Sequence, residues 1–208
     1  FYCPISDTKR FKDIVKINEL TLARPDAPEG INRIIEEIRL CQSTGIGITG
    51  GDPLMRLERT CRYIKALKKE FGDSFHIHLY TTLDHVTQEA LLHLEDAGLD
   101  ELRFHFDVTD ILLWEKASFA EGLEMTVGAE IPSIPGYIEK TKELIHFCKK
   151  LGFIRFYSPI LPSGRFFPQA IFRSPDISYP AQLFPYDPLR LKAKLPDSLS
   201  LPPDSLSP

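Results

Sequence analysis

Apolar and polar positions follow two different periods along the first 160 residues of the chain. Five short segments are predicted to be strands, beginning near residues 45, 76, 102, 125 and 153. Between each pair lies a segment in which apolar residues recur at helical spacing, and a further helix is predicted from residue 28 to 41. Residues 13–22 fit a short hairpin. Strict alternation of strand and helix predicts an α/β fold with a parallel sheet and right-handed crossovers.

Four of the predicted strands carry apolar side chains on one face and polar side chains on the other. In His76–Tyr80, for example, Ile77 and Leu79 oppose two histidines and a tyrosine. A parallel sheet covered by helices on both faces would have near-continuous apolar strands. The polar face therefore predicts either a flat sheet with one solvated face or a full or partial barrel with a polar interior. In a barrel, the chemistry would lie at the carboxyl ends of the strands.

The first predicted strand, Gly45-Ile46-Gly47-Ile48-Thr49, stops at a pair of glycines. Gly50 and Gly51 lack Cβ atoms, so the backbone can approach a ligand closely. Asp52 follows, and Pro53 fixes the direction of the exit into the next helix. A strand, two glycines, an acid, a proline and a helix together predict a turn that faces a ligand.

Composition excludes several classes of protein. The net charge of −4 gives no electrostatic footprint for nucleic acid, and no apolar run approaches the roughly 18 residues that span a bilayer. The four cysteines form no disulfide or zinc pattern, which predicts a reducing, cytoplasmic location. Cys41, Cys61 and Cys148 are expected to be small buried hydrophobes on helices. Cys3, by contrast, lies in an irregular opening segment.

The character of the chain changes after about residue 160. Of the 17 prolines, most fall from Pro159 onward, and Pro-Asp-Ser-Leu-Ser occurs at both 196–200 and 203–207. Such a segment is expected to be extended or disordered rather than part of a helix or sheet interior. We therefore expect a core domain at residues 1–160 and a Pro-rich tail at 161–208.

The cysteine of the opening segment and the Gly-Gly-acid-Pro turn together resemble the radical S-adenosylmethionine (radical SAM) superfamily, in the branch related to pyruvate formate-lyase activating enzymes. Phe1-Tyr2-Cys3 is similar to the end of the family's C-x3-C-x2-C motif. Gly50-Gly51-Asp52-Pro53 is similar to the family's GGE(P) turn, with Asp in place of Glu. The resemblance covers roughly residues 1–160. It implies a partial (βα)6 TIM-like barrel whose first strand is missing from this sequence.

The resemblance also implies cofactors and site residues. In the family, three cysteines hold a [4Fe–4S] cluster whose fourth iron is chelated by SAM, and one-electron transfer cleaves SAM to a 5′-deoxyadenosyl radical. An electron donor such as flavodoxin or ferredoxin and an unidentified substrate would complete the reaction. The implied metal ligand is Cys3, and the implied SAM-binding residues are Gly50, Gly51, Asp52, Pro53, His105, Asp107 and Glu130.

Alternatives remain for several of these residues. His105, Asp107 and Glu130 could equally form a polar network that fills a barrel, and His76, His78 and Arg103, deeper in the strands, are expected to have packing or network roles. Two of the motif's cysteines would precede Phe1, so we expect a chain cut within the motif that cannot hold a normal cluster.

Two other functions compete with the radical SAM assignment. One is a non-redox (βα)-barrel enzyme in which Gly50-Gly51 cradles a phosphate, although Asp52 would disfavour an anion there. The other is a degenerate, non-catalytic scaffold that keeps a site for SAM or another metabolite.

Overall fold

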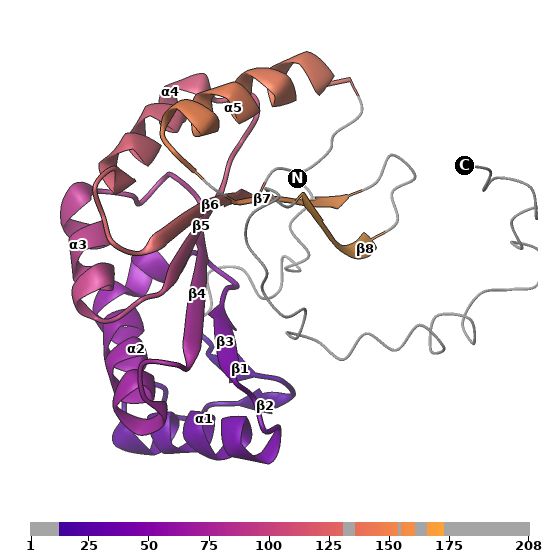
Figure 1. The fold of residues 1–208 in the computed structure, drawn as a ribbon. Helices are drawn as coiled ribbons and strands as arrows, with labels where there is room; N and C mark the ends of the chain where they lie inside the picture. Colours follow the sequence, from indigo (N-terminus) through magenta and orange to yellow (C-terminus); the bar gives the residue numbers. More distant parts are fainter. Residues whose placement is uncertain (1–12, 131–135, 154, 161–165, 173–208) are drawn as a thin grey trace, which may run out of the picture. The chain divides into compact units, whose positions relative to one another are not determined.

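The computed structural model describes residues 13–130, 136–153, 155–160 and 166–172 (Figure 1). The chain divides into two units, Phe1–Ile177 and Ser178–Pro208, and every described residue lies in the first. Its elements are β1 (Lys16–Ile17), β2 (Leu20–Thr21), α1 (Pro28–Leu40), β3 (Gly45–Ile48), the 3-10 helix η1 (Pro53–Arg56), α2 (Leu57–Phe71), β4 (His76–Thr81), α3 (Gln88–Asp96), β5 (Glu101–His105), α4 (Ile111–Trp114), the 3-10 helix η2 (Glu115–Ala120), β6 (Thr126–Glu130), α5 (Ile138–Lys150), β7 (Arg155–Ile160) and β8 (Phe166–Phe172).

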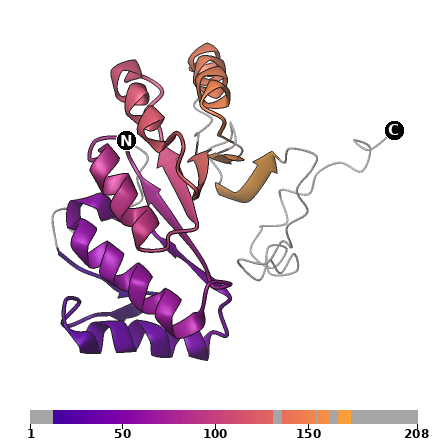
Figure 2. The ribbon, with the colours of Figure 1, turned by 60° about the vertical axis from the view of Figure 1, so that its left-hand side comes forward.

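Six of the strands form one sheet, in the order β3-β4-β5-β6-β7-β8. Strands β3 to β7 pair in parallel, and β8 pairs antiparallel with β7. Each parallel strand lies beside the one before it in the chain, so right-handed crossovers place the connecting helices on the same face. Figures 1 and 2 show α2 and α3 on one side of β4 and β5. The mixed α/β fold, the parallel sheet and the five predicted strands are thus confirmed.

The core lies between this sheet and its helices. Ile77, Leu79, Leu102 and Phe104 point to the helix face of the sheet and have no exposed surface. Buried apolar residues of the helices pack against them, among them Ile64, Leu67, Leu91 and Leu94. Each such side chain contributes about 1.5–3 kcal/mol by leaving water. The alternation predicted from the sequence therefore separates the core face from the polar face correctly.

The helix predicted between the strands that begin near residues 102 and 125 is not one continuous α-helix. Asp110 caps a single α-helical turn, α4, by accepting the Leu113 amide at 3.4 Å, and the chain continues as η2. Ala117 and Ala120 are both buried, and residues three apart lie on one side of a 3-10 helix. The tighter helix therefore directs both alanines into the core.

One strand lies beyond the five that were predicted, in the segment expected to be extended or disordered. β8 contains Pro168 and lies at the edge of the sheet, beside β7 alone. An edge strand tolerates proline because one of its sides needs no ladder hydrogen bonds. Cys41 also departs from prediction: it is exposed just past the end of α1, Cys61 is half-buried and Cys148 is buried. The apolar spacing predicted a helix that includes Cys41, whereas α1 ends one residue earlier, at Leu40.

A charge network holds the hairpin segment against α2. The Arg59 guanidinium, only 8% exposed as a residue, donates to Asp13 at 2.6 Å and to Asp26 at 2.8 Å. These carboxylates raise the pKa of Arg59. The network therefore fixes both the start of the described chain and the loop that leads into α1.

A second charged contact lies at the end of the sheet where the parallel strands begin. We call this end the amino edge. Lys68 of α2 pairs with Asp100 at 2.7 Å and also donates to the Asp73 and Phe75 carbonyls. Asp100 in turn accepts the Ile77 amide at 2.6 Å. One lysine and one aspartate thus connect α2, β4 and the residue before β5.

Candidate functional site

The Gly50-Gly51 turn follows the carboxyl end of β3. Gly50 has φ +122°, a backbone conformation that strongly favours glycine, whereas Gly51 has no such constraint. A Cβ built on Gly51 would meet no described atom within 4 Å. Inside β3 the situation is opposite, because a Cβ on Gly47 would lie 2.5 Å from Nε2 of His78. Packing accounts for Gly47 and backbone conformation for Gly50, but neither accounts for the missing side chain of Gly51.

Asp52 fixes this turn to the end of β4. Its carboxylate caps η1 by accepting the Leu54 amide at 3.0 Å. It also accepts the Thr81 hydroxyl at 2.7 Å, and the amide and hydroxyl of Thr82 at 3.1 and 2.8 Å. Pro53 is buried at the first position of η1, and its carbonyl accepts the Thr60 hydroxyl at 3.0 Å. Sequence reasoning missed both threonines, which directly follow the neighbouring predicted strand, His76–Tyr80.

His105 and Glu130 lie opposite each other at the carboxyl ends of β5 and β6. Nδ1 of His105 is 4.0 Å from a Glu130 carboxylate oxygen. Burial lowers the pKa of His105, and burial also raises the pKa of Glu130, against the opposing effect of Arg103. Both shifts favour the neutral form, so the pair suits hydrogen bonding to a ligand more than strong ion pairing.

Asp107 makes hydrogen bonds within the loop that follows β5. Its side chain accepts the Thr109 amide at 2.7 Å and the Thr109 hydroxyl at 2.6 Å, and these bonds lower the pKa of Asp107. Its carbonyl accepts the Trp114 indole N–H at 2.8 Å. Asp107 is exposed, and its contacts shape the connection from β5 into α4.

A buried network fills the polar face further down the strands. Arg103 donates to both carboxylate oxygens of Glu101, at 2.9 and 3.1 Å, and Nε2 of His76 lies 3.1 Å from the same carboxylate. Arg103 also donates to the Tyr80 hydroxyl, and burial raises the pKa of that tyrosine. The network role predicted for His76 and Arg103 is confirmed. Glu101 was missed, although it shares a strand face with Arg103, two residues away.

The described site residues thus lie at or just after the carboxyl ends of neighbouring strands. We call this end of the sheet the carboxyl rim. The turn at Gly50–Pro53 contacts the end of β4, and His105 faces Glu130. Cys3 lies outside the described residues.

The described residues supply no ligand set for an iron–sulfur cluster. Among them, no group of three or more His, Cys, Asp or Glu side chains could hold a metal ion. Cys61 lies on α2 and donates to the His93 carbonyl at 3.5 Å. Cys148 lies on α5, where burial raises the pKa of its thiol to about 12. Neither cysteine is gathered with another ligand.

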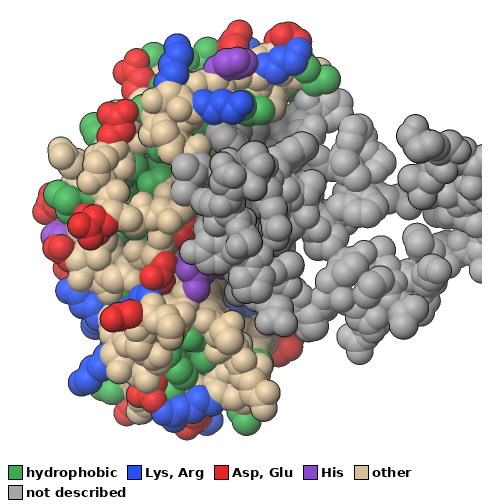
Figure 3. All heavy atoms as spheres, viewed as in Figure 1, with side chains coloured by type: hydrophobic (Ala, Val, Ile, Leu, Met, Phe, Trp, Pro, Cys, Tyr) green, Lys and Arg blue, Asp and Glu red, His purple; other side chains and the backbone are tan. Residues whose placement is uncertain are grey.

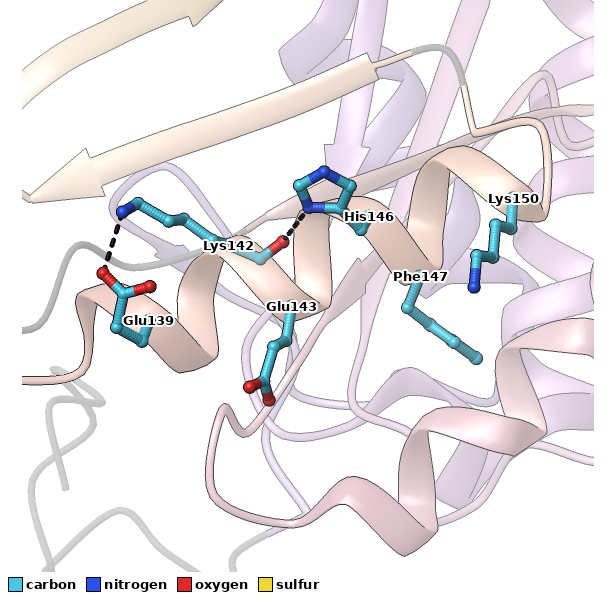
Figure 4. Close-up of a pocket in the computed structure, with 6 residues that line it drawn as sticks. All are labelled: Glu139, Lys142, Glu143, His146, Phe147 and Lys150. Atoms are coloured by element: carbon cyan, nitrogen blue, oxygen red, sulfur yellow. Dashed lines mark hydrogen bonds and ion pairs between the residues drawn. The ribbon is translucent and has the colours of Figure 1, made fainter.

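A surface hollow lies along α5, and none of the predicted site residues lines it (Figure 4). All six residues that line it belong to this one helix, and three of its polar side chains make local contacts. Lys142 pairs with Glu139 at 2.8 Å, and Nδ1 of His146 lies 2.8 Å from the Lys142 carbonyl. Because no second element contributes, the hollow lacks the convergent polar groups of a ligand site.

Surface charge gives no competing site on the face seen in Figure 3. Acidic and basic side chains are interspersed over the described helices there. Within the described part of the chain, no helix combines the length and apolar character needed to cross a membrane.

Comparison with known proteins agrees with the resemblance carried by the turn. Over 144 residues the chain is 42% identical to a protein of Methanocaldococcus jannaschii described as a "putative glycyl-radical enzyme activating enzyme". The match covers 65% of this chain and 36% of the relative, so the chain spans little more than a third of that protein's length. No protein-family model matches the chain. The similarity supports the relation to the radical SAM superfamily, in its glycyl-radical-activating branch.

Proposed function

We propose that this chain is part of a radical SAM enzyme of the glycyl-radical-activating type and that its Gly50-Gly51 turn binds the amino end of SAM. The observation that carries the proposal is Gly51, a glycine that neither packing nor backbone conformation requires. A turn without side chains lets main-chain carbonyls reach an ammonium group at hydrogen-bonding distance. The 42% identity to the archaeal relative supports the same assignment.

The remaining rim residues would bind the rest of the SAM molecule. His105 and Glu130 are half-buried groups with shifts towards their neutral forms, which suits hydrogen bonds to ribose hydroxyls or adenine nitrogens. Asp107 would contribute through the loop that it shapes. We further propose that β3 to β7 form part of a TIM-like barrel, because their sequential order and single helix layer are those of a barrel wall.

The [4Fe–4S] cluster implied by the resemblance would supply one electron to SAM when bound. Its ligand set is not among the described residues, so for this chain the proposal extends to SAM binding. Cys3 as a cluster ligand, reductive cleavage to a 5′-deoxyadenosyl radical, a flavodoxin or ferredoxin donor, an unidentified substrate and a cytoplasmic location are proposed for the whole protein.

A phosphate site at the same turn is less compatible with the contacts. A phosphate would need the amides at the start of η1, but Asp52 already accepts the Leu54 amide. Its carboxylate would also repel the anion. The phosphate hypothesis therefore becomes a control in the binding experiment.

Titration of the ¹⁵N-labelled chain with SAM tests the proposal by amide chemical shifts. We expect SAM to shift the Gly50 and Gly51 signals, and 5′-methylthioadenosine, which lacks the amino-acid end, to leave them unchanged. Gly51→Ala should weaken SAM binding by about tenfold, corresponding to about 1.4 kcal/mol, without loss of folding. Shifts at the turn with inorganic pyrophosphate but not with SAM would contradict the proposal and favour the phosphate site.

A further inference from the structure

We propose that Asp52, Thr81 and Thr82 form a brace that positions the Gly50-Gly51 turn, and that the turn's main chain, not the Asp52 carboxylate, contacts the ammonium group of the ligand. The ligand part of this inference rests on the proposed function. The brace itself rests on contacts within the chain. It makes Asp52 a positioning residue.

The hydrogen bonds of Asp52 leave little room for a direct contact. Oδ1 accepts the Leu54 amide at 3.0 Å and the Thr81 hydroxyl at 2.7 Å. Oδ2 accepts the Thr82 amide at 3.1 Å and has the Thr82 hydroxyl at 2.8 Å. A carboxylate has about four lone-pair sites, so these donors together can fill them. A ligand ammonium would have to displace one of them, whereas no main-chain donor among the described residues is bonded to the Gly50 or Gly51 carbonyl.

The brace joins the segments that follow β3 and β4, past the point where the main-chain pairing of the two strands ends. The last paired residues of the two strands are Ile48 and Leu79. Thr81 ends β4 and is only 3% exposed, so its hydroxyl has a fixed position beneath the turn. Since Asp52 joins this buried hydroxyl to the first amides of η1, the glycines between β3 and η1 are anchored at their carboxyl-terminal side.

The donors of the brace are all neutral amides and hydroxyls. Neutral donors leave the formal charge of the carboxylate in place, so it still attracts a cation over a distance. The Thr82 hydroxyl has one hydrogen but lies 2.8 Å from both Asp52 and Asp84. The Thr81 hydroxyl lies 2.7 Å from Asp52 and 2.9 Å from the Thr82 carbonyl, so the acceptor that competes for its hydrogen is neutral. Thr81 is therefore the better hydroxyl to remove in a test, because no second carboxylate takes part in its contact.

The test compares Thr81→Val with Thr81→Ser in the full chain. Valine has nearly the shape of threonine but no hydroxyl, while serine keeps the hydroxyl, and both leave the Asp52 charge unchanged. Without ligand, hydrogen exchange of the Leu54 and Thr82 amides should accelerate about tenfold in Thr81→Val and stay near wild type in Thr81→Ser. SAM affinity, from the same titration, should fall about tenfold in Thr81→Val only.

The two possible roles of Asp52 predict opposite results. If its carboxylate were the direct ligand, removing the Thr81 hydroxyl would free a lone pair, and SAM affinity would stay equal or rise. That result would overturn the inference, as would unchanged amide exchange. Asp52→Asn provides a second measurement if Thr81→Val does not fold. Its amide can accept only through one atom, so either the Leu54 or the Thr82 amide must lose protection.

Failure of the proposed function remains distinguishable from failure of the brace. If the wild-type chain does not shift at Gly50 and Gly51 with SAM, the proposed function and the ligand part of the inference are both wrong. The exchange rates of the Leu54 and Thr82 amides in Thr81→Val and Asp52→Asn then decide the brace alone.

Discussion

The amino edge and the carboxyl rim, at opposite ends of the parallel strands, each have one aspartate that joins neighbouring segments. The two aspartates have different partners. At the amino edge, Asp100 accepts from the Lys68 ammonium at 2.7 Å and from the Ile77 amide at 2.6 Å. At the carboxyl rim, Asp52 accepts from the Leu54 and Thr82 amides and lies within hydrogen-bonding distance of the Thr81 and Thr82 hydroxyls. The first aspartate is held by a cation and the second by neutral groups.

This difference separates a structural contact from one compatible with a binding site. A carboxylate paired with a lysine has its charge compensated and presents little field to a ligand. A carboxylate held by neutral donors is equally well ordered but keeps its attraction for cations. The amino edge should therefore depend more on its aspartate for stability, and the carboxyl rim should depend on its aspartate for both order and binding.

Asp100→Ala should cause the largest loss of stability. It leaves Lys68, whose side chain is 13% exposed, without its anion and the Ile77 amide without its acceptor. We expect the free energy of unfolding to fall by about 2–3 kcal/mol in urea titrations. Lys68→Met is the control, because it removes the cation and leaves the Ile77 amide paired; it should cost less. A loss below about 1 kcal/mol for Asp100→Ala would contradict the structural role of the amino edge.

Asp52→Ala should cost less, about 1–2 kcal/mol, because it removes the η1 cap and the hydroxyl contacts but leaves no buried cation behind. Urea titration again gives the comparison, with Asp84→Ala as a neighbouring control outside the η1 cap. If Asp52→Ala were more destabilising than Asp100→Ala, the proposed contrast between the two edges would be wrong.

The order of elements could be predicted from the sequence because each strand and helix has its own apolar period. The starts of β3 to β7 lie within two residues of the predicted positions 45, 76, 102, 125 and 153. What could not be predicted depends on contacts between distant residues. The break of the predicted helix into α4 and η2 accompanies the burial of Ala117 and Ala120 in the core. β8, which contains Pro168, pairs with β7 at an edge of the sheet, where proline is tolerated.

The candidate site was predictable in its position but not in its contacts. Gly-Gly-acid-Pro located the turn, and strand ends located His105 and Glu130. The partners of Asp52 could not be read from spacing, because Thr81 and Thr82 are about 30 residues away and meet the turn only through the β3–β4 register. The resemblance implied that Asp52 binds SAM, whereas in the structure its carboxylate lies within hydrogen-bonding distance of two amides and two hydroxyls of the chain itself.

A smaller loss of stability should distinguish a glycine inside β3, Gly47, from one in the turn at the carboxyl rim, Gly51. Gly47→Ala would bring a Cβ within 2.5 Å of the buried His78 ring, so either the ring or the strand must shift. We expect thermal unfolding to report a loss of about 1–2 kcal/mol. Gly51→Ala meets no described atom within 4 Å and should change stability by less than about 0.5 kcal/mol. Equal losses for both variants would remove the main argument that Gly51 serves a ligand.

The smallest effect concerns charge at the rim and depends on pH. Burial raises the pKa of Glu130, so the folded protein holds this proton more tightly than the unfolded chain does. Its charged form therefore costs stability above the ordinary glutamate pKa, and the cost grows until pH passes the raised value. Glu130→Gln removes that cost. We expect the variant to match wild type in urea titrations at pH 3.5 and to exceed it by up to about 1 kcal/mol at pH 7.

Asp100→Asn is the matched control for that measurement, because it neutralises a carboxylate at the other edge of the sheet. Asn keeps an acceptor for the Ile77 amide but removes the anion that compensates Lys68, so stability at pH 7 should fall. The two neutralisations should thus have opposite signs. If Glu130→Gln instead lowers stability at pH 7, then His105 or Arg103 compensates the Glu130 charge. Glu130 would then belong to a charge pair like that of the amino edge, and the proposed neutral hydrogen bonds of His105 and Glu130 to ribose or adenine would be wrong.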